Sequence, residues 1–359
     1  MTSRTHGRGS TVRLDSLAIW RTKLPDVKHA ILPPHDSRPN PLVSDSMLYV
    51  SVFAPGAVCA LDRQTGKLCW RKEIPKLAGS AVYLAREKLL AKTAHTLYSL
   101  DPRTGATIWT FCPYGDSGEW IYSAPTILRD SVFIGDRRGY LHCLDLRSGR
   151  ARWAQRTNRA RNDDVNTTPI VSNGLVIVGT NANRAVAYEP ETGKCAWTCT
   201  LDGPSGFGPL AYKRLIAVFT DSIYLLTPES GKVARKFSWK NDGVTMAAST
   251  PEGIVATLRG PWPPAPTVQL IGLKESGIKF SKTIRASVAF LRYAKESKLV
   301  YISHLEGIDV CQPSTGDVIC AIRHGERSEG IGPVEVSGNT IYALTGDGYV
   351  YASRHPVSQ

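Results

Sequence analysis

Short runs of alternating apolar and polar residues follow one another along almost the whole chain. In one stretch the runs are "APTIL", "SVFIG", "YLHCLDL" and "ARWAQRT", separated by "RD", "DRRG" and "RSG". The next stretch repeats this order with "TPIV", "LVIVGT", "AVAYE" and "CAWTCT". Helical periodicity is nearly absent, and 31 glycines and 23 prolines punctuate the runs. Short alternation between turn signals predicts an all-β chain.

One turn recurs together with its flanking strands. The stretch "ALDRQTGKLCW", from Ala60 to Trp70, returns in register as "SLDPRTGATIW", "CLDLRSGRARW" and "AYEPETGKCAW". Weaker copies follow as "LLTPESGKVAR", "GLKESGIKF" and "CQPSTGDVIC". The glycines of the seven turns are spaced by 39, 44, 44, 38, 46 and 39 residues. A period near forty with several short strands in each unit predicts the blades of a β-propeller.

The two ends of the chain predict an eighth blade. The tail "GPVEVSGNTIYALTGDGYVYAS" supplies three strands but no fourth, and "LAIWRTKLP" supplies a strand in which Trp20 stands where Trp70 stands in its unit. We therefore expect an eight-bladed β-propeller of four-stranded antiparallel blades, closed by pairing of the N-terminal strand with the C-terminal strands. Seven blades remain the alternative, because the fifth to seventh units are degenerate.

These boundaries predict a single propeller domain over residues 15–355. Residues 1–14 are expected to be loosely ordered, and residues 356–359 form a short tail. Within each unit, the Asp that opens the turn is suited to accept backbone hydrogen bonds, and the Gly permits a positive φ. Each tryptophan can cover about 150–250 Å² of apolar surface between neighbouring blades. The recurring Asp, Gly and Trp are therefore interpreted as structural.

The repeat closely resembles the tryptophan-docking repeat of pyrroloquinoline-quinone-type β-propellers, from about residue 15 to 355. It is strong in the first four units and weaker afterwards, where Arg235 and Cys320 stand in the tryptophan register. The resemblance implies either of two kinds of protein. Quinoprotein dehydrogenases carry the quinone and a calcium ion on the axis, and an assembly propeller of the outer-membrane β-barrel machinery is a protein-binding scaffold without cofactor. Fold alone does not choose between them.

Many quinoprotein alcohol dehydrogenases have two adjacent cysteines beside the quinone, and this chain has no Cys-Cys dipeptide. They are also longer and exported. We therefore expect no quinone and no other cofactor. The sequence also lacks a G-x-S-x-G elbow, an H-E-x-x-H pair and a Walker loop, so most familiar catalysis is unsupported.

Charge and cysteine content add three expectations. A net charge of +13 favours an acidic partner, but no basic run of five residues supports nucleic-acid binding. The eight cysteines include no C-x-x-C pair, so we expect reduced cysteines and no metal site. The N-terminal "MTSRTHGRGSTVRLDS" has no apolar signal core, and no apolar run reaches the ~20 residues of a membrane span, so a cytoplasmic monomer without membrane insertion is predicted.

Candidate site residues lie in the segments that enter the innermost strands and in the connections between second and third strands, where propeller ligands gather at the channel mouth. The candidates for acid–base chemistry are Glu119, Asp163 and Asp164. The candidates for ligand binding are Asp116, Trp120, Tyr122, Asp136, Arg137, Arg138, Arg161, Asn162, Asn166, Asn181, Arg259, Trp262 and His304. Carboxylates, guanidinium groups and aromatic rings at one mouth can bind a polar ligand.

Two functions remain open at this stage. The first is a binding or scaffolding module that recognises a protein or a small polar ligand of acidic character at the channel mouth. The second is a cofactor-independent enzyme of the lyase, hydrolase or cyclase type that uses the carboxylates and arginines of the mouth. Clustered buried carboxylates favour the enzyme, and an exposed apolar or single-sign patch favours the scaffold.

Overall fold

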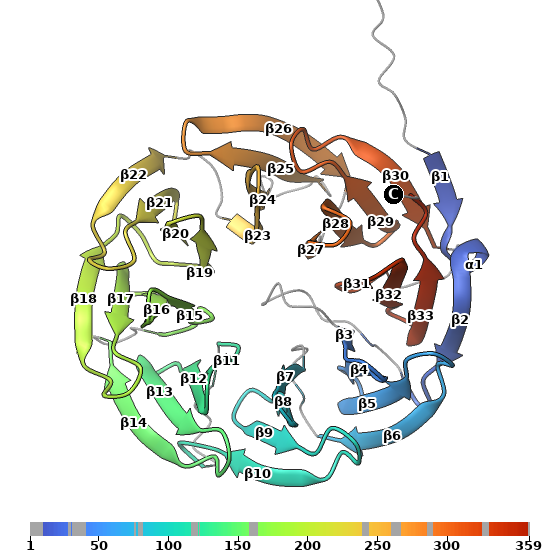
Figure 1. The fold of residues 1–359 in the computed structure, drawn as a ribbon, viewed down its shortest axis with the longest axis horizontal. Coiled ribbons are helices and arrows are strands. Elements are labelled where there is room, and N and C mark those ends of the chain that lie inside the picture. The colour runs from blue at the N-terminus through green and yellow to red at the C-terminus, as the bar shows by residue number, and fades with distance from the viewer. Residues whose placement is uncertain are drawn as a thin grey trace, which may run out of the picture.

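Eight small sheets stand around a common axis in the computed structural model of this chain (Figure 1). The structure describes residues 10–27, 30, 41–74, 77, 82–115, 121, 123–157, 164–238, 244–259, 267–285, 290–324 and 330–357. Within these residues, seven sheets have four strands and one has five. The predicted eight-bladed propeller of antiparallel blades is confirmed.

The strands of each blade run outward from the axis in sequence order. Blade 1 contains β3 (Leu42–Val43), β4 (Met47–Val52), β5 (Ala57–Asp62) and β6 (Leu68–Glu73). Blade 2 contains β7 (Tyr83–Ala85), β8 (Lys88–Lys92), β9 (Leu97–Leu100) and β10 (Thr107–Phe111). Blade 3 contains β11 (Thr126–Leu128), β12 (Ser131–Gly135), β13 (Tyr140–Asp145) and β14 (Ala151–Arg156). Blade 4 contains β15 (Ile170–Ser172), β16 (Leu175–Thr180), β17 (Arg184–Tyr188) and β18 (Cys195–Thr200).

The remaining blades keep this order although their sequences are degenerate. Blade 5 contains β19 (Phe207–Tyr212), β20 (Leu215–Phe219), β21 (Ser222–Leu226) and β22 (Val233–Ser238). Blade 6 contains β23 (Val244–Thr250), β24 (Gly253–Arg259), β25 (Thr267–Lys274) and β26 (Gly277–Arg285). Blade 7 contains β27 (Phe290–Ala294), β28 (Leu299–His304), β29 (Gly307–Cys311) and β30 (Val318–Arg323).

Blade 8 joins the two ends of the chain. Its inner strands are β31 (Glu335–Ser337), β32 (Thr340–Leu344) and β33 (Tyr349–Arg354), and its outer strand is β2 (Ala18–Lys23). β2 pairs with β33 in antiparallel register, so that Trp20 lies opposite Ala352. The predicted closure of the ring by its termini is therefore confirmed, and the edge of β33 is covered.

A further strand precedes β2. Residues 1–14 are predicted to lie outside the propeller, but β1 (Ser10–Arg13) pairs in parallel with β30, the outer strand of blade 7. A single helical turn, α1 (Leu14–Leu17), then leads into β2. Leu14 is 1% exposed and packs in the core between blades 7 and 8. The reason is that an edge strand offers unpaired backbone groups to any neighbouring extended segment; residues 1–9 lie outside the described part.

The repeated tryptophan fastens each blade to the next. The indole N–H of Trp109 in blade 2 donates to the carbonyl of Leu146 in blade 3 at 3.0 Å, and the ring lies over Gly149. Four other indoles make the same contact with the following blade, namely Trp20 with Arg63, Trp70 with Pro102, Trp153 with Pro190 and Trp197 with Pro228. In blade 6 the Phe280 ring takes this place against Gly316. The apolar clusters accordingly lie between adjacent blades.

The propeller has two faces, which its topology defines. The loop face carries the segments that enter the innermost strands and the connections between second and third strands, such as 136–139. The turn face carries the repeated Gly turns, such as 146–150, and the connections between first and second strands. Consecutive antiparallel strands reverse direction, so these two sets of connections must lie at opposite ends of every blade.

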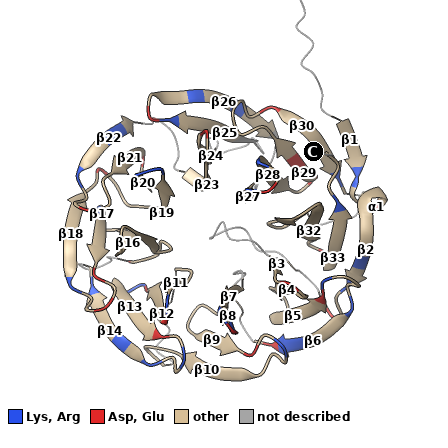
Figure 2. Cartoon of the chain, viewed as in Figure 1, with Lys and Arg blue, Asp and Glu red and all other residues tan. Residues whose placement is uncertain are grey.

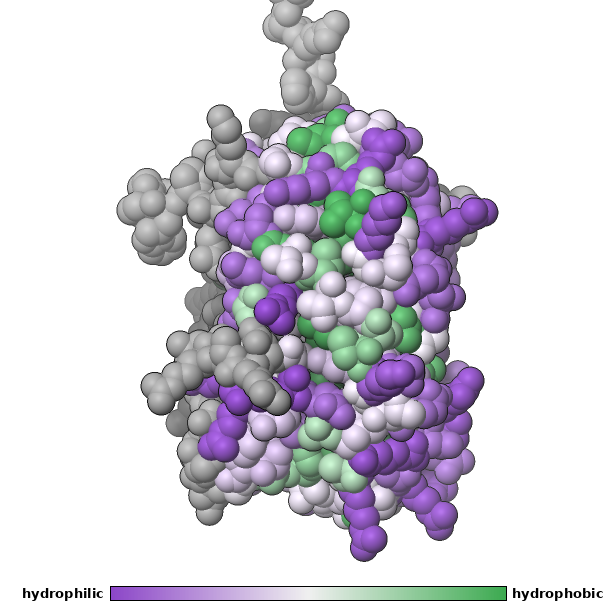
Figure 3. All heavy atoms as spheres, turned by 90° about the vertical axis from the view of Figure 1, so that its left-hand side faces the viewer, coloured by the Kyte–Doolittle hydropathy of each residue, from purple (hydrophilic) through white to green (hydrophobic). Residues whose placement is uncertain are grey.

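The outer wall is charged rather than continuously apolar. Figure 2 shows Lys and Arg on outer strands such as β6 and β22. On the side drawn in Figure 3, hydrophilic side chains alternate with small apolar areas. Lys and Arg on edge strands discourage pairing with other chains. Among the described helices, none is long and apolar enough to cross a membrane.

Candidate functional site

The predicted site residues divide by whether the structure describes them. Seven have described side chains, namely Asp136, Arg137, Arg138, Asp164, Asn166, Asn181 and His304. Arg259 lies at the end of β24, and its side chain is outside the described part. The rest lie outside the described residues, namely Asp116, Glu119, Trp120, Tyr122, Arg161, Asn162, Asp163 and Trp262. Their proposed roles at the channel mouth stay predictions.

Asp136 lies at the end of β12 on the loop face and is 0% exposed. One carboxylate oxygen accepts the backbone N–H groups of Arg138 and Tyr140, both at 2.9 Å. The other accepts the Tyr114 hydroxyl and lies 2.6 Å from Nε2 of His142. Burial, followed by the hydrogen bond to this carboxylate, raises the pKa of Tyr114. All four contacts are internal, so Asp136 joins the segment after β10 to the β12–β13 turn.

The same position caps the equivalent turn in other blades. Ile134 pairs with His142 across β12 and β13, and Asp136 lies two residues after Ile134. At the equivalent position, two residues after the matching paired residue, four other blades carry threonine. Those hydroxyls accept backbone N–H groups of their own turns, in Thr93, Thr180, Thr220 and Thr345. Asp136 therefore caps its turn as the threonines do in other blades. In addition, its carboxylate forms a buried hydrogen bond with His142.

Blade 7 contains this acid–imidazole pair with the two residues exchanged. His304 occupies the turn-capping position, and its Nδ1 accepts the N–H of Glu306 at 3.2 Å. Its Nε2 lies 3.4 Å from Asp309, which is also 2.7 Å from Arg323. Burial acts to raise the pKa of Asp309, but the hydrogen bond from His304 and the charge of Arg323 outweigh it, so the pKa is lowered. His304 is 3% exposed and serves the turn.

Three predicted residues do come together on the loop face of blade 4. The Asn181 backbone N–H donates to the Asp164 carbonyl at 3.1 Å, and its side-chain amide donates to the Asp164 carboxylate at 3.3 Å. The Asn166 amide donates to Oδ1 of Asn181 at 3.0 Å. These bonds tie the segment entering β15 to the β16–β17 turn. The result is an ordered polar surface beside blade 3.

Arg137 and Arg138 leave the β12–β13 turn in exposed positions. The Arg138 guanidinium lies 4.2 Å from the centre of the Tyr114 ring, which holds it over the segment after β10. Sequence reasoning missed Tyr114 and His142. A histidine inside the apolar run "YLHCLDL" was the available signal, because a buried imidazole requires a polar partner.

The described residues bear on the question of a metal site and on the state of the cysteines. Within them, no group of three or more His, Cys, Asp or Glu side chains is arranged to hold a metal ion. All eight cysteines are free, and burial raises the pKa of Cys59 to about 11 and of Cys311 to about 12. These buried thiols are therefore protonated near neutral pH and act as small apolar side chains.

The Tyr114 hydroxyl gives the first testable consequence. Replacing Tyr114 with Phe is expected to lower the free energy of unfolding by about 2 kcal/mol, because it removes a donor to a buried carboxylate. Tyr140→Phe is the matched control, since the Tyr140 ring also packs near His142 without a hydroxyl bond to Asp136. Urea unfolding measures both. Equal effects of the two substitutions would show that the hydroxyl bond contributes nothing.

Known proteins resemble this chain in sequence and in fold. An outer membrane protein assembly factor BamB of Pseudomonas aeruginosa is 28% identical over 186 residues, covering 50% of this chain and 47% of that protein. The chain thus spans about half the length of this curated relative. A crystal structure of BamB from Moraxella catarrhalis superposes with a TM-score of 0.57 at 15% identity, over 94% of this chain and 99% of that one.

An enzyme has the same architecture. A quinohemoprotein alcohol dehydrogenase from Comamonas testosteroni superposes with a TM-score of 0.70 at 13% identity, over 96% of this chain and 77% of that one. Identity this low shows the fold alone. The likeness agrees in fold with the predicted resemblance to pyrroloquinoline-quinone-type propellers, and it transfers no chemistry.

The relatives also correct the predicted location. The cytoplasmic prediction rests on the lack of an apolar signal core in the N-terminal residues and of an apolar run long enough to span a membrane. Proteins named outer membrane protein assembly factors, from Pseudomonas aeruginosa and Escherichia coli among others, match this chain. Those names point away from the cytoplasm, so the cytoplasmic prediction is wrong. The physical reason is that hydropathy along the chain carries less information about location than five blades of matching repeat.

The repeat itself carries the strongest relation. A family model described as "Outer membrane protein assembly factor BamB" matches residues 10–237, which run from β1 to β22. This range contains the five docking tryptophans and the glycine turns on which they rest. The matched part is more than half of the chain, and the chain therefore belongs to the BamB-type family of outer membrane protein assembly factors.

Proposed function

We propose that this propeller is a protein-binding scaffold and that its loop face receives the partner. The single observation that carries the proposal is a pair of hydrogen-bonded anchors in blades 3 and 4, of which the first is buried and the second half-buried. Asp136 fixes the segment after β10 through Tyr114, and Asn181 fixes the segment before β15 through Asp164. Two neighbouring segments are thereby held ready for contact, which lowers the ordering cost that binding must overcome.

The family supports the class of partner. The Pseudomonas aeruginosa relative is named for outer membrane protein assembly. We propose that the present chain acts in the same process, and that its partner is a protein of outer membrane protein assembly. A propeller suits such a role because loops on a rigid scaffold can vary without altering the fold.

Site-specific photo-crosslinking tests the proposed face. A photo-reactive residue in place of exposed Arg137 is expected to give a covalent adduct with a partner protein in the source cell, detected as a discrete band of higher mass. The matched control places the same residue at Lys232, which is exposed on the turn face of blade 5. An adduct from Lys232 but none from Arg137 would contradict the proposal.

A further inference from the structure

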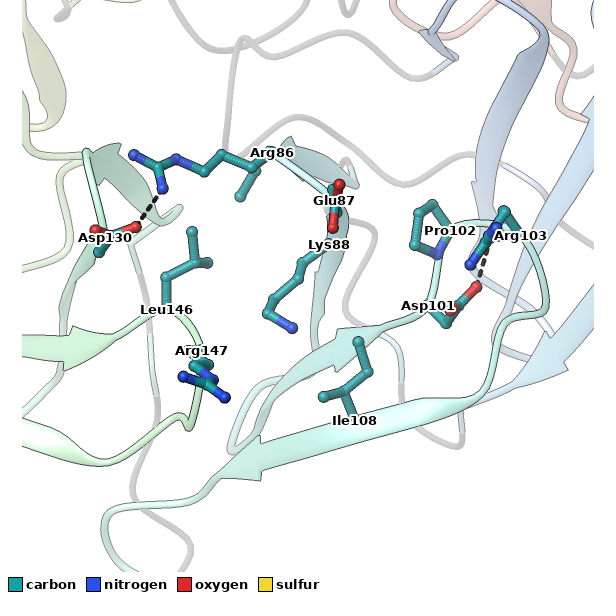
Figure 4. Close-up of a pocket in the computed structure, with 11 residues that line it drawn as sticks. Arg86, Glu87, Lys88, Asp101, Pro102, Arg103, Ile108, Asp130, Leu146 and Arg147 are labelled. Carbon is teal, nitrogen blue, oxygen red and sulfur yellow. Dashed lines mark hydrogen bonds and ion pairs between the residues drawn. The ribbon is translucent and has the colours of Figure 1, made fainter.

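A groove of about 890 Å³ opens on the turn face between blades 2 and 3. Its walls come from the β7–β8 connection, from the two Gly turns of the blades, and from the start of β10 (Figure 4). The lining residues are Ala85, Arg86, Glu87, Lys88, Asp101, Pro102, Arg103, Ile108, Asp130, Leu146 and Arg147. This groove lies at the opposite end of the blades from the loop face, so it is separate from the proposed partner site there.

The acidic groups of the groove are mostly engaged within the protein. Asp130 forms an ion pair with Arg86 at 2.5 Å across the two blades. The Asp101 carboxylate accepts the backbone N–H groups of Arg103 and Thr104 at 2.8 and 3.0 Å. These backbone hydrogen bonds lower the pKa of Asp101, so the carboxylate stays charged and committed to its turn.

Three cations of the groove have no such engagement. Lys88, Arg103 and Arg147 form no ion pair with any carboxylate of the described residues, although the charge of Arg103 helps to lower the pKa of Asp101. Glu87 and Asp101 likewise form no ion pair with a described cation. In Figure 4, Arg103 and Arg147 lie on opposite sides of Lys88. Positive charge is thus spread along the groove rather than gathered at one point.

Apolar side chains line the groove beside these cations. Ile108 is 44% exposed at the start of β10, and its neighbour Trp109 is buried, as alternation along a strand requires. Pro102 and Leu146 add apolar atoms on the two sides. A ligand that fits must therefore combine spaced negative charges with an apolar side chain.

The groove is also rigid. The Pro102 carbonyl accepts the Trp70 indole and the Tyr49 hydroxyl, at 3.0 and 3.1 Å. The Leu146 carbonyl accepts the Trp109 indole at 3.0 Å. The two Gly turns that carry Arg103 and Arg147 are therefore fixed by the docking of the preceding blade, and little conformational entropy is lost when a ligand binds.

We propose that this groove binds an acidic peptide segment of a protein partner, one in which carboxylates alternate with apolar residues. A single carboxylate or phosphate ligand would be served best by converging cations. Here Pro102 and Ile108 lie between Lys88 and Arg103, and Arg147 lies on the other side of Lys88 (Figure 4). A nucleic-acid backbone has spaced charge but no aliphatic side chain for the apolar strip. The inference does not depend on the loop-face proposal, because the two sites share no residue.

Fluorescence anisotropy on the full chain tests the inference, with a labelled peptide of alternating glutamate and leucine as the probe. Saturable binding at low salt is expected for the unchanged chain. The double variant Lys88→Glu with Arg147→Glu should weaken binding by about tenfold or more, because attraction becomes like-charge repulsion. Ile108→Ser should also weaken it, and it alters a side chain that is 44% exposed.

The matched control is Lys67→Glu with Lys194→Glu. Both residues are exposed in Gly turns, outside the groove, and the net charge changes equally. This control should bind the peptide within about twofold of the unchanged chain, because charges outside a site act only through screened long-range fields. Equal weakening in the two double variants, or unchanged binding by the groove variant, would overturn the inference. So would tighter groove-dependent binding of a single-stranded oligonucleotide.

Discussion

A chain that lacks residues 1–24 is expected to lose cooperative unfolding and to populate an open, aggregation-prone ring. The deletion removes β2, the outer strand of blade 8, and leaves the edge of β33 unpaired. It also removes Trp20, whose indole N–H donates to the Arg63 carbonyl at 3.1 Å, and the buried Leu24. Far-UV circular dichroism during thermal unfolding, with size-exclusion chromatography, measures the result.

The expected size of this effect follows from the side chains that the deletion removes. The deletion removes two buried leucines, Leu14 and Leu24, and the loss of each costs about 2–5 kcal/mol; the partly buried Trp20 side chain adds to that loss. A whole domain is stable by only about 5–15 kcal/mol. The hydrogen bond from the Thr22 hydroxyl to the Gly66 carbonyl, at 2.7 Å, disappears as well. The sum consumes most of the stability, so partial retention of the fold is not expected.

Two smaller changes control for the deletion. Removing residues 1–9 leaves β1, α1 and β2 in place and is expected to leave the melting temperature unchanged. Trp20→Ala alone should give an intermediate decrease, since the strand remains while the indole is absent. If the chain without residues 1–24 melts cooperatively at the original temperature, then β2 does not close the ring.

The blades were predictable from sequence because the same motif marks both the hairpin within a blade and the contact between blades. In the first four units, the turn that ends in Gly also receives the tryptophan of the preceding blade, so one motif reports both the hairpin and the interface. Blade 6 departs from this. Lys274 pairs directly with Gly277 across a tight turn, and the Phe280 ring replaces the tryptophan against Gly316. An aromatic ring of similar shape therefore takes the docking place in blade 6, although no tryptophan stands in the repeat there to indicate it.

The site was less predictable for a physical reason. Asp136 and His304 were chosen as polar residues near a mouth, but their buried atoms cap turns that threonines cap in other blades. A sequence shows which residues are polar and not which partners they meet inside the fold. The Lys88 and Arg147 groove was missed for the complementary reason, because its walls come from two blades that only the closed ring brings together.

Gly149→Ala is expected to lower the free energy of unfolding by about 2–5 kcal/mol. Gly149 has a φ of +72°, and a left-handed conformation costs an alanine about 1–2 kcal/mol. A methyl group built there would also lie 2.5 Å from Cδ2 of Trp109. Overpacking of this kind costs about 1–3 kcal/mol more, because the indole must shift from its place on the Leu146 carbonyl.

Gly174→Ala separates the two causes. Gly174 has a φ of +75°, but a methyl group built there meets nothing within 4 Å. It should therefore cost only the backbone strain of about 1–2 kcal/mol. Urea unfolding of both variants gives the difference between them as the energy of the tryptophan contact.

A double-mutant cycle then assigns that difference to the indole. In a chain that carries Trp109→Ala, Gly149→Ala should cost no more than Gly174→Ala, because the ring that the methyl group meets is absent. Equal costs for the two glycines in the unchanged chain would show that the indole yields freely. In that case the docking tryptophan would cover the next blade without constraining it, and the rigidity inferred for the groove between blades 2 and 3 would lose its basis.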